Sequence, residues 1–292
     1  MLDKRGRKIA EGGCAEIFEW EEGSKILKLA RPNIYYGDAA VEYQKNLTVW
    51  ESGIPSARPF ELVDIEGRPG IVFERIIGDT LTERFIRQGL QQADIHGDGE
   101  LVRVTAQLLY DIHQRNDVPL PPSQREQLIY AIQHAVQLSE AEREHIVNSL
   151  RPLPQKAQLC HGDPNPHNIL IQKDNKPLLI DWMNAAIGNP EADLAEYIIM
   201  IRYAVLPADM PEPILKMFDQ VRELMIERFM EEYTRKSGIT HAEVEPWLVP
   251  IAARKLTVDS IPDAEKERLL HFIRENLSMH DLGEIQTEEV NP

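Results

Sequence analysis

The stretch HGDPNPHN at residues 161–168, followed by IDW at residues 180–182, is the most informative part of this chain. It places a carboxylate at Asp163, an amide five residues later at Asn168, and a second carboxylate thirteen residues further on at Asp181. Phosphoryl transfer from ATP uses one Asp to orient the attacking hydroxyl and accept its proton, and an Asn with a second Asp to hold magnesium. The spacing therefore indicates a phosphoryl-transfer site. The alternative is a surface loop with an unrelated Asp at a strand end.

The segments around this loop are short and apolar. Residues 159–160, 169–171 and 178–180 are separated by turn residues such as KDNKP at 173–177, which predicts the strands of a small hairpin that carries the loop. Pro164 and Pro166 disfavour helical geometry in the residues before them. We therefore expect an extended, fixed loop.

The composition is that of a globular protein. The 292 residues are 42% hydrophobic and 27% charged, enough for one large domain or two lobes. No apolar run is long enough to span a membrane, and the first residues lack the apolar centre of a signal peptide. Two cysteines cannot build a disulfide framework. We therefore expect a cytoplasmic protein that does not associate with membranes.

The net charge of −16 is unevenly distributed. Residues 1–78 contain 11 Lys and Arg against 13 Asp and Glu, a net charge of −2, which leaves −14 for residues 79–292. Binding to a nucleic-acid backbone needs the opposite sign, so we expect no nucleic-acid partner. An acidic second half favours a cationic small substrate by electrostatic steering. The alternative is that the acidic surface only keeps the protein in solution.

The N-terminal part predicts five strands and one helix. The helix is expected to begin at a cap formed by Asp38 and to end at Gly53. The expected strands lie at residues 8–10, 15–20, 25–30, 60–65 and 69–75. These elements predict a small α+β lobe.

The sequence becomes helical in pattern after Gly78. Three capping boxes, at residues 80–83, 123–126 and 139–142, predict helix starts, and Asn189-Pro190 predicts another. We expect the tail beyond about residue 280 to fray. The whole chain is therefore predicted to pair a small β-rich lobe with a larger helical one.

The motifs from Gly12 to Asp193 resemble those of the aminoglycoside phosphotransferase and choline kinase family, which are small-molecule kinases with a protein-kinase-like fold. The resemblance implies a bilobal α+β fold with an N-lobe at residues 1–77 and a C-lobe at residues 78–292. It also implies ATP and Mg²⁺ as cofactors. The expected activity is phosphorylation of a hydroxyl on a small molecule.

The resemblance also implies roles for individual residues. In the N-lobe, Lys28 would contact the α- and β-phosphates and Glu42 would hold Lys28 in place, with Glu51 as a weaker rival. Asp163 would be the catalytic base, and Asn168 and Asp181 the magnesium ligands. The remaining expected ATP contacts are the phosphate turn Gly12, Gly13, Cys14 and Ala15, and the hinge groups that read adenine, the Glu74 carbonyl and the Ile76 N–H.

Three alternatives differ in class or substrate. A protein kinase is disfavoured because only about a dozen residues separate Asp181 from Asp193, too few for an activation segment. A nucleotide-binding regulator would be expected to have lost one of the catalytic residues, and none is lost. The acceptor is open between a cationic molecule, such as an aminoglycoside or amino-alcohol, and a neutral metabolite or sugar.

Overall fold

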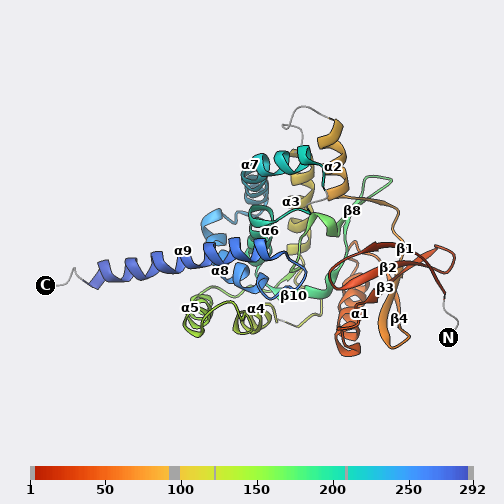
Figure 1. Cartoon of the computed structure of the whole chain (residues 1–292), viewed down its shortest axis with the longest axis horizontal. Helices are drawn as coiled ribbons and strands as arrows, with labels where there is room; N and C mark the ends of the chain where they lie inside the picture. Colours follow the sequence, from red (N-terminus) through yellow and green to blue (C-terminus); the bar gives the residue numbers. More distant parts are fainter. Residues whose placement is uncertain (1–3, 92–98, 122, 208–209, 289–292) are drawn as a thin grey trace.

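The computed structural model describes residues 4–91, 99–121, 123–207 and 210–288. The β-rich and helical parts lie side by side, and the last helix extends away from the helical part (Figure 1). The expected α+β class with a small sheet and a larger helical part is confirmed. Within the described residues, no helix is both long enough and apolar enough to cross a membrane.

A five-stranded antiparallel sheet forms the N-terminal part, in the order β1-β2-β3-β5-β4. The strands are β1 (Arg5–Glu11), β2 (Ala15–Trp20), β3 (Lys25–Ala30), β4 (Pro59–Ile65) and β5 (Arg68–Glu74). Because side chains alternate along β3, Leu27 and Leu29 are fully buried on one face while Lys28 points to the other. Lys28 pairs in register with Ile71 of β5, which fixes its position in the middle of the sheet.

Helix α1 (Tyr36–Glu51) packs beside this sheet and begins earlier than the sequence suggested. The expected cap at Asp38 is wrong: the cap position is Tyr35, and Asp38 lies in the first helical turn. There its carboxylate interacts favourably with the positive end of the helix dipole. An acidic residue suits both the cap and the first turn, so the sequence pattern could not distinguish the two positions. Gly53 follows the helix with a φ of +76°, the left-handed conformation that glycine adopts most easily.

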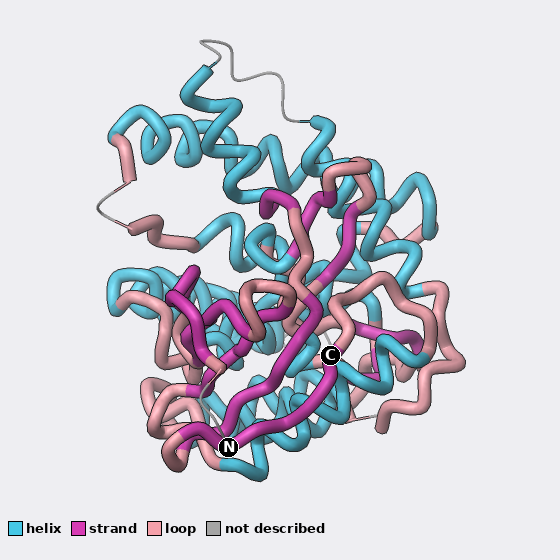
Figure 2. Tube along the Cα trace, turned by 90° about the vertical axis from the view of Figure 1, so that its right-hand side faces the viewer, coloured by secondary structure: helices cyan, strands magenta, loops and turns pink. Residues whose placement is uncertain are grey.

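The C-terminal part is a helical assembly with two small sheets (Figure 2). One sheet has the order β6-β8-β9 and the other pairs β10 with β7. The strands are β6 (Gly78–Thr80), β7 (Gln158–Cys160), β8 (Ile169–Gln172), β9 (Pro177–Leu179) and β10 (Ala186–Gly188). The helices are α2 (Leu81–Gln91), α3 (Gly99–His113), α4 (Gln124–Gln133), α5 (Glu140–Leu150), α6 (Pro190–Tyr203), α7 (Glu212–Ser237), α8 (His241–Lys255) and α9 (Asp263–Glu288).

The short strands correct one detail of the expected hairpin. The β8 and β9 strands do form a hairpin, as predicted. Strand β7, which contains Cys160, instead pairs with β10 in an antiparallel register that places Cys160 opposite Ala186. The loop at residues 161–168, which we call the catalytic loop because of its expected role, is therefore held between two small sheets.

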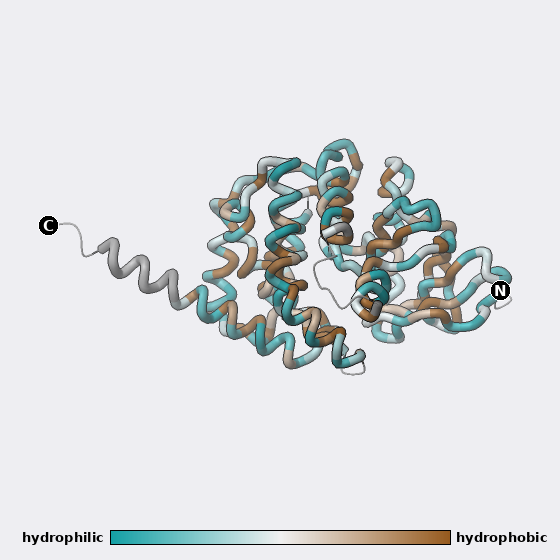
Figure 3. The backbone as a smooth tube through the Cα atoms, turned by 90° about the horizontal axis from the view of Figure 1, so that it is seen from above, coloured by the Kyte–Doolittle hydropathy of each residue, from teal (hydrophilic) through white to brown (hydrophobic). Residues whose placement is uncertain are grey.

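Helix α6 is the centre of the C-terminal part. Every residue from Pro190 to Ile201 is buried. Figure 3 shows hydrophobic residues distributed through both the sheet and the helices of the molecule. A helix that is covered all round lies in the core of a domain. Side chains on α6 are thus held rigidly, including those that reach the catalytic loop.

Two of the three expected capping boxes are present. Thr80 with Glu83, and Ser139 with Glu142, exchange the reciprocal hydrogen bonds of that motif. The box at Ser123 is wrong, because its backbone is not extended and its hydroxyl interacts with Gln127 instead. Helix α9 runs from Asp263 to Glu288, and residues 289–292 lie outside the described part. The fraying of the tail stays a prediction.

Candidate active site

The catalytic loop follows β7 and is anchored by Asp193 in the first turn of α6. The Asp193 carboxylate accepts hydrogen bonds from the backbone N–H of His161, at 2.6 Å, and of Gly162, at 2.9 Å. His113 of α3 lies 3.2 Å from the same carboxylate. Burial opposes its ionisation, but the hydrogen bonds and electrostatic interactions with His113 and His161 together more than offset this and lower the pKa of Asp193. Asp193 therefore fixes the backbone immediately before Asp163.

His161 orients the same loop through both ring nitrogens. Its Nε2–H donates to the carbonyl of Ile180 at 3.0 Å, so Nδ1 is the acceptor for the N–H of Asp163, at 3.3 Å. The ring also packs edge-on against the buried Trp182, with centroids 4.6 Å apart. His161 thus connects the Asp163 loop to Ile180, the residue before Asp181.

Asn168 lies within hydrogen-bond distance of Asp163. Its amide Nδ2 donates to the Oδ2 of Asp163 at 3.0 Å and to the backbone carbonyl of Asp163 at 3.1 Å. Because the nitrogen faces Asp163, the amide oxygen of Asn168 is the atom available to a cation. The turn of residues 166–168 gives the side chain this orientation, and it begins at Asn165, whose side chain caps it.

Lys28 connects the two parts of the molecule. Its Nζ lies 2.8 Å from Oε1 of Glu42 on α1 and 2.8 Å from Oδ1 of Asp181. Burial would lower the pKa of Lys28, but the carboxylates of Asp181 and Glu42 more than offset this and raise it. Lys28 is therefore a fixed cation, and the partner on α1 is Glu42 rather than Glu51.

Asp181 has unusual backbone geometry. Its φ is +65°, in the left-handed region that residues with a Cβ seldom adopt. Such a conformation costs roughly 1–3 kcal/mol and is commonly found at functional sites. Burial opposes ionisation of the side chain, but the nearby Lys28 ammonium lowers the pKa of Asp181 overall. The carboxylate is thus ionised and turned toward Lys28.

A buried charged cluster that the sequence did not predict lies behind Asp163. Glu196 of α6 accepts hydrogen bonds from Arg254 at 2.5 Å and from Lys255 at 3.0 Å, both on α8. Arg254 also donates to the carbonyl of Gly162, at 3.0 Å, next to Asp163. No motif links residues separated by 58 positions, so this cluster had no signal in the sequence.

The environment of Asp163 makes it a better proton acceptor than an ordinary Asp. Burial is the main effect that raises its pKa, and the negative charge of Glu196 adds to it. Lys255, His161 and Arg254 act in the opposite direction without cancelling the shift. A general base works best when its pKa approaches the pH of reaction, so this shift suits that role.

A cavity of about 470 Å³ separates the N-terminal sheet from the β8–β9 hairpin. Its walls include Glu74, Ile76 and Ile77 of the hinge, and Lys28 and Asp181 at its inner end. The cavity is large enough to enclose a small ligand. The hinge residues expected to contact adenine and the lysine expected to contact phosphates therefore open onto one space.

The Gly12–Gly13 turn lies close to the lysine. The N–H of Gly12 donates to the carbonyl of Ala15 at 2.8 Å, which closes a tight turn. Cys14 and Ala15 share a neighbouring hollow with Lys28. Burial raises the pKa of the Cys14 thiol, so this cysteine is not an activated nucleophile.

Gly13 also meets the segment between α8 and α9. A Cβ placed on Gly13 would lie 2.2 Å from the Cβ of Ser260, a contact that real atoms do not make. Glycine is therefore required here by a close approach from the C-terminal part, in addition to any need for the turn to approach a ligand. The sequence did not indicate this contact.

The donor set fits magnesium–ATP. The free amide oxygen of Asn168 and the carboxylate of Asp181 are hard oxygen donors of the kind Mg²⁺ prefers. Lys28 supplies positive charge beside Asp181, and Cys14 and Ala15 of the turn share a hollow with Lys28. The fold and this arrangement of side chains define a phosphotransferase with a kinase-like site.

Comparison with known proteins identifies the family. Residues 17–244, most of the chain, match the model of the phosphotransferase enzyme family. The matched region includes Lys28, Asp163, Asn168 and Asp181 and leaves out the turn at Gly12–Ala15 and the residues of the site after residue 244. The chain therefore belongs to the phosphotransferase enzyme family, and it is a small-molecule kinase that acts on hydroxyl groups.

Solved structures share the fold at low sequence identity. Choline kinase LicA from Streptococcus pneumoniae is 17% identical, with a TM-score of 0.61, over 94% of this chain and 95% of that one. Aminoglycoside phosphotransferase APH(4)-Ia is 15% identical, with a TM-score of 0.61, over 92% of each chain. A thermostable mutant of APH(4)-Ia in a ternary complex with AMP-PNP and hygromycin B is 14% identical, with a TM-score of 0.59, over 92% of each chain.

Proposed function

We propose that this kinase transfers the γ-phosphate of ATP, with Mg²⁺, to a hydroxyl of a small cationic molecule in the cytoplasm. The observation that carries the proposal is that Lys28 lies 2.8 Å from Asp181, that Asn168 donates to Asp163, and that the N–H of Ile180, beside Asp181, donates to the carbonyl of Asn168 at 2.9 Å. Lys28 comes from the N-terminal sheet and the other three from residues 163–181, and a structural role alone does not require all four. A structural relative that binds an ATP analogue supports the choice of nucleotide.

Asp163 orients the acceptor hydroxyl and takes its proton. A loose phosphoryl-transfer transition state asks little of a base, so most of its effect comes from alignment. The hydrogen bond that the Asp163 N–H donates to Nδ1 of His161 holds the backbone of Asp163, and the one that Asn168 donates to Oδ2 holds its carboxylate. This preorganisation is what the loop contributes to the reaction.

Lys28 binds the α- and β-phosphates, and Glu42 keeps its ammonium in place. The turn at Gly12–Ala15 covers the phosphates, and the Glu74 carbonyl and Ile76 N–H contact adenine. Asn168 and Asp181 hold Mg²⁺, which when bound neutralises phosphate charge. A nucleotide-binding regulator would not need a base at Asp163, and a turnover assay separates it from a kinase.

Magnesium should govern how strongly ATP stabilises the fold. If Asn168 and Asp181 hold the metal, ATP at a hundredfold above its Kd adds about 2.7 kcal/mol to the free energy of unfolding when Mg²⁺ is present. A much smaller increase in the free energy of unfolding is expected with a chelator, because the phosphates of ATP then face Asn168 and Asp181 without a bridging Mg²⁺. Thermal unfolding of the full chain with ATP measures the difference. Equal shifts with and without Mg²⁺ would disprove the metal assignment.

The cationic acceptor rests on the acidic C-terminal part, whose net charge is −14 of the total −16. Steering by this charge should make kcat/KM for a cationic acceptor fall as salt rises, because the Debye length decreases from about 10 Å at 0.1 M to about 3 Å at 1 M. The measurement uses saturating Mg-ATP, with a neutral alcohol of similar size as the control. A flat profile for the amine, or a preference for neutral sugars, would favour the alternative of a neutral metabolite.

A further inference from the structure

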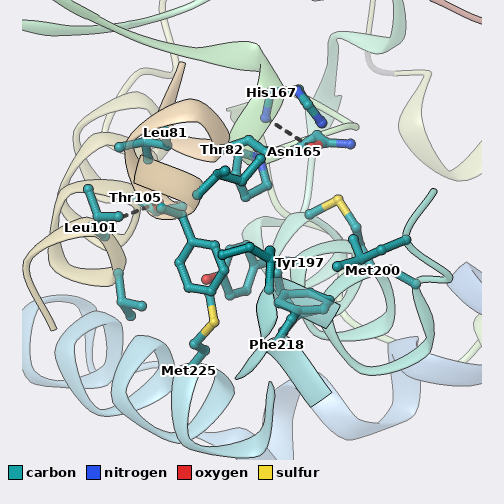
Figure 4. Close-up of a pocket in the computed structure, with 18 of the residues that line it drawn as sticks. Leu81, Thr82, Leu101, Thr105, Asn165, His167, Tyr197, Met200, Phe218 and Met225 are labelled. Atoms are coloured by element: carbon teal, nitrogen blue, oxygen red, sulfur yellow. Dashed lines mark hydrogen bonds between the residues drawn. The ribbon is translucent and has the colours of Figure 1, made fainter. Parts of the chain in front are cut away.

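A second cavity, of about 160 Å³, lies beneath the catalytic loop among α2, α3, α6 and α7 (Figure 4). Its roof is formed by Asn165, Pro166 and His167, which begin two residues after Asp163. The rest of its wall is almost wholly apolar. Among the described residues that line it there is no Asp, Glu, Lys or Arg.

Tyr197 is the most deeply buried polar residue in this wall, which also contains Thr82 and Thr105. The side chain of Tyr197 is 1% exposed and stacks on Phe229, with centroids 4.0 Å apart. Its hydroxyl has no hydrogen-bond partner among the described residues, whereas the nearby hydroxyl of Thr105 donates to the carbonyl of Leu101 at 3.1 Å. Figure 4 shows Tyr197 in the middle of the cavity lining, between the catalytic loop and Phe218 with Met225.

An unpartnered hydroxyl in an apolar cavity needs an explanation. The hydroxyl oxygen of Tyr197 is not among the fully enclosed atoms that lack a partner, so it faces the cavity space. A polar group that faces apolar space without a hydrogen bond costs free energy, and phenylalanine would fill the same place on α6 without that cost. The cost is recovered if a ligand brings a polar group to the hydroxyl. Burial raises the pKa of Tyr197, so the hydroxyl stays protonated and can donate.

The position of the cavity identifies the occupant as the acceptor substrate. A molecule lying against Asn165 and His167 touches the same loop that carries Asp163, on the side of the helical part. The nucleotide cavity lies elsewhere, between the N-terminal sheet and the β8–β9 hairpin, and shares no lining residue with this one. An apolar cavity of about 150 Å³ accommodates a benzene-sized group.

We propose that the acceptor of this kinase is amphipathic: it carries one aromatic ring or a branched aliphatic group of similar size, which fills the cavity, and a polar atom that accepts a hydrogen bond from Tyr197. Its reacting hydroxyl extends from this group toward Asp163. The inference rests on the proposed function and narrows its substrate class. A cationic amino-alcohol with a ring satisfies both the acidic surface and the apolar cavity.

The first experiment compares acceptors that differ only in a ring. Phosphorylation of ethanolamine is compared with that of 2-amino-2-phenylethanol, and phosphorylation of glycerol with that of 3-phenoxypropane-1,2-diol, using the full chain and Mg-ATP. We expect the ring to raise kcat/KM by about 10- to 100-fold, the range for burying an aromatic group. Ala204→Phe should abolish this preference, because Ala204 lines the cavity and a phenyl group there occupies the space.

The second experiment removes only the hydroxyl. Tyr197→Phe should raise KM for the better ring-bearing acceptor by about 2- to 12-fold, with kcat nearly unchanged, and should leave thermal stability equal or higher. Tyr130→Phe is the matched control, because Tyr130 is 64% exposed on α4 and lies outside the cavity. An unchanged KM in Tyr197→Phe would overturn the role of the hydroxyl.

Direct binding separates failure of this inference from failure of the proposed function. Calorimetry without ATP measures binding of 3-phenoxypropane-1,2-diol to the wild type and to Ala204→Phe. Binding that the substitution removes, together with no phosphorylation of any alcohol, would support the cavity and count against the proposed function. Turnover of alcohols without any gain from the ring, or absence of binding, would overturn the cavity proposal.

Discussion

Asp163→Asn is expected to reduce turnover by roughly 10²–10⁴-fold while leaving ATP affinity nearly unchanged. The substitution keeps the size of the side chain and removes its ability to accept a proton. Asn168 donates to Oδ2 of Asp163, and an amide oxygen can still accept that bond, so the loop should retain its shape. Steady-state kinetics and ATP titration of the two proteins measure the two effects separately.

The control for this variant is Asp174→Asn. Asp174 lies in the exposed turn between β8 and β9 and pairs only with the exposed Lys176. The same chemical change there should leave turnover within a factor of two. If Asp163→Asn retained turnover within a few fold of the wild type, Asp163 would not be the base.

The pH dependence of kcat/KM should reflect the raised pKa of Asp163. Because burial and Glu196 raise its pKa, the carboxylate is protonated, and inactive as a base, at a higher pH than an ordinary Asp. The acid limb of kcat/KM should therefore lie above the usual range for an aspartate. Measurement between pH 4 and pH 8 locates this limb, and a limb at the ordinary value would show that the shift is absent under working conditions.

The local parts of this site could be predicted from the sequence. The spacing of Asp163, Asn168 and Asp181 depends on one hairpin and the loops at its two ends, so neighbouring residues determine it. Lys28 could also be located, because an isolated charge in an alternating apolar strand must face away from the core. The sequence left two candidates on one helix for the partner of Lys28, Glu42 and Glu51. The distance of 2.8 Å between Nζ of Lys28 and Oε1 of Glu42 identifies Glu42 as the partner.

The nonlocal parts could not be predicted. Glu196 and Arg254 meet only because α6 and α8 pack against each other, and neither helix carries a pattern that specifies the pair. The approach of Ser260 to Gly13 likewise depends on how the two parts of the chain dock. The cavity around Tyr197 is formed by four helices, and in sequence its lining looks like ordinary core.

Lys28→Ala should lower turnover by roughly 10²–10³-fold, the range for losing one preorganised group that stabilises developing charge. Glu42→Ala should have a smaller effect, because Glu42 acts only through the lysine, 2.8 Å away. The ammonium also lies 2.8 Å from Asp181, so without Glu42 it keeps one carboxylate partner and is expected to settle against it. The main consequence of Glu42→Ala should therefore be a misplaced lysine.

The double variant tests whether the two residues act as one unit. If Glu42 works only by positioning Lys28, removing both should cost little more than removing Lys28 alone, so the effects on kcat/KM are less than additive. Lys216→Ala is the matched control, because Lys216 forms a lysine–glutamate pair with Glu212 on the exposed surface of α7 and lines none of the cavities described above. It should leave turnover unchanged even if it lowers stability slightly. Full additivity of Lys28→Ala and Glu42→Ala would mean that the ion pair seen here does not position the lysine during turnover.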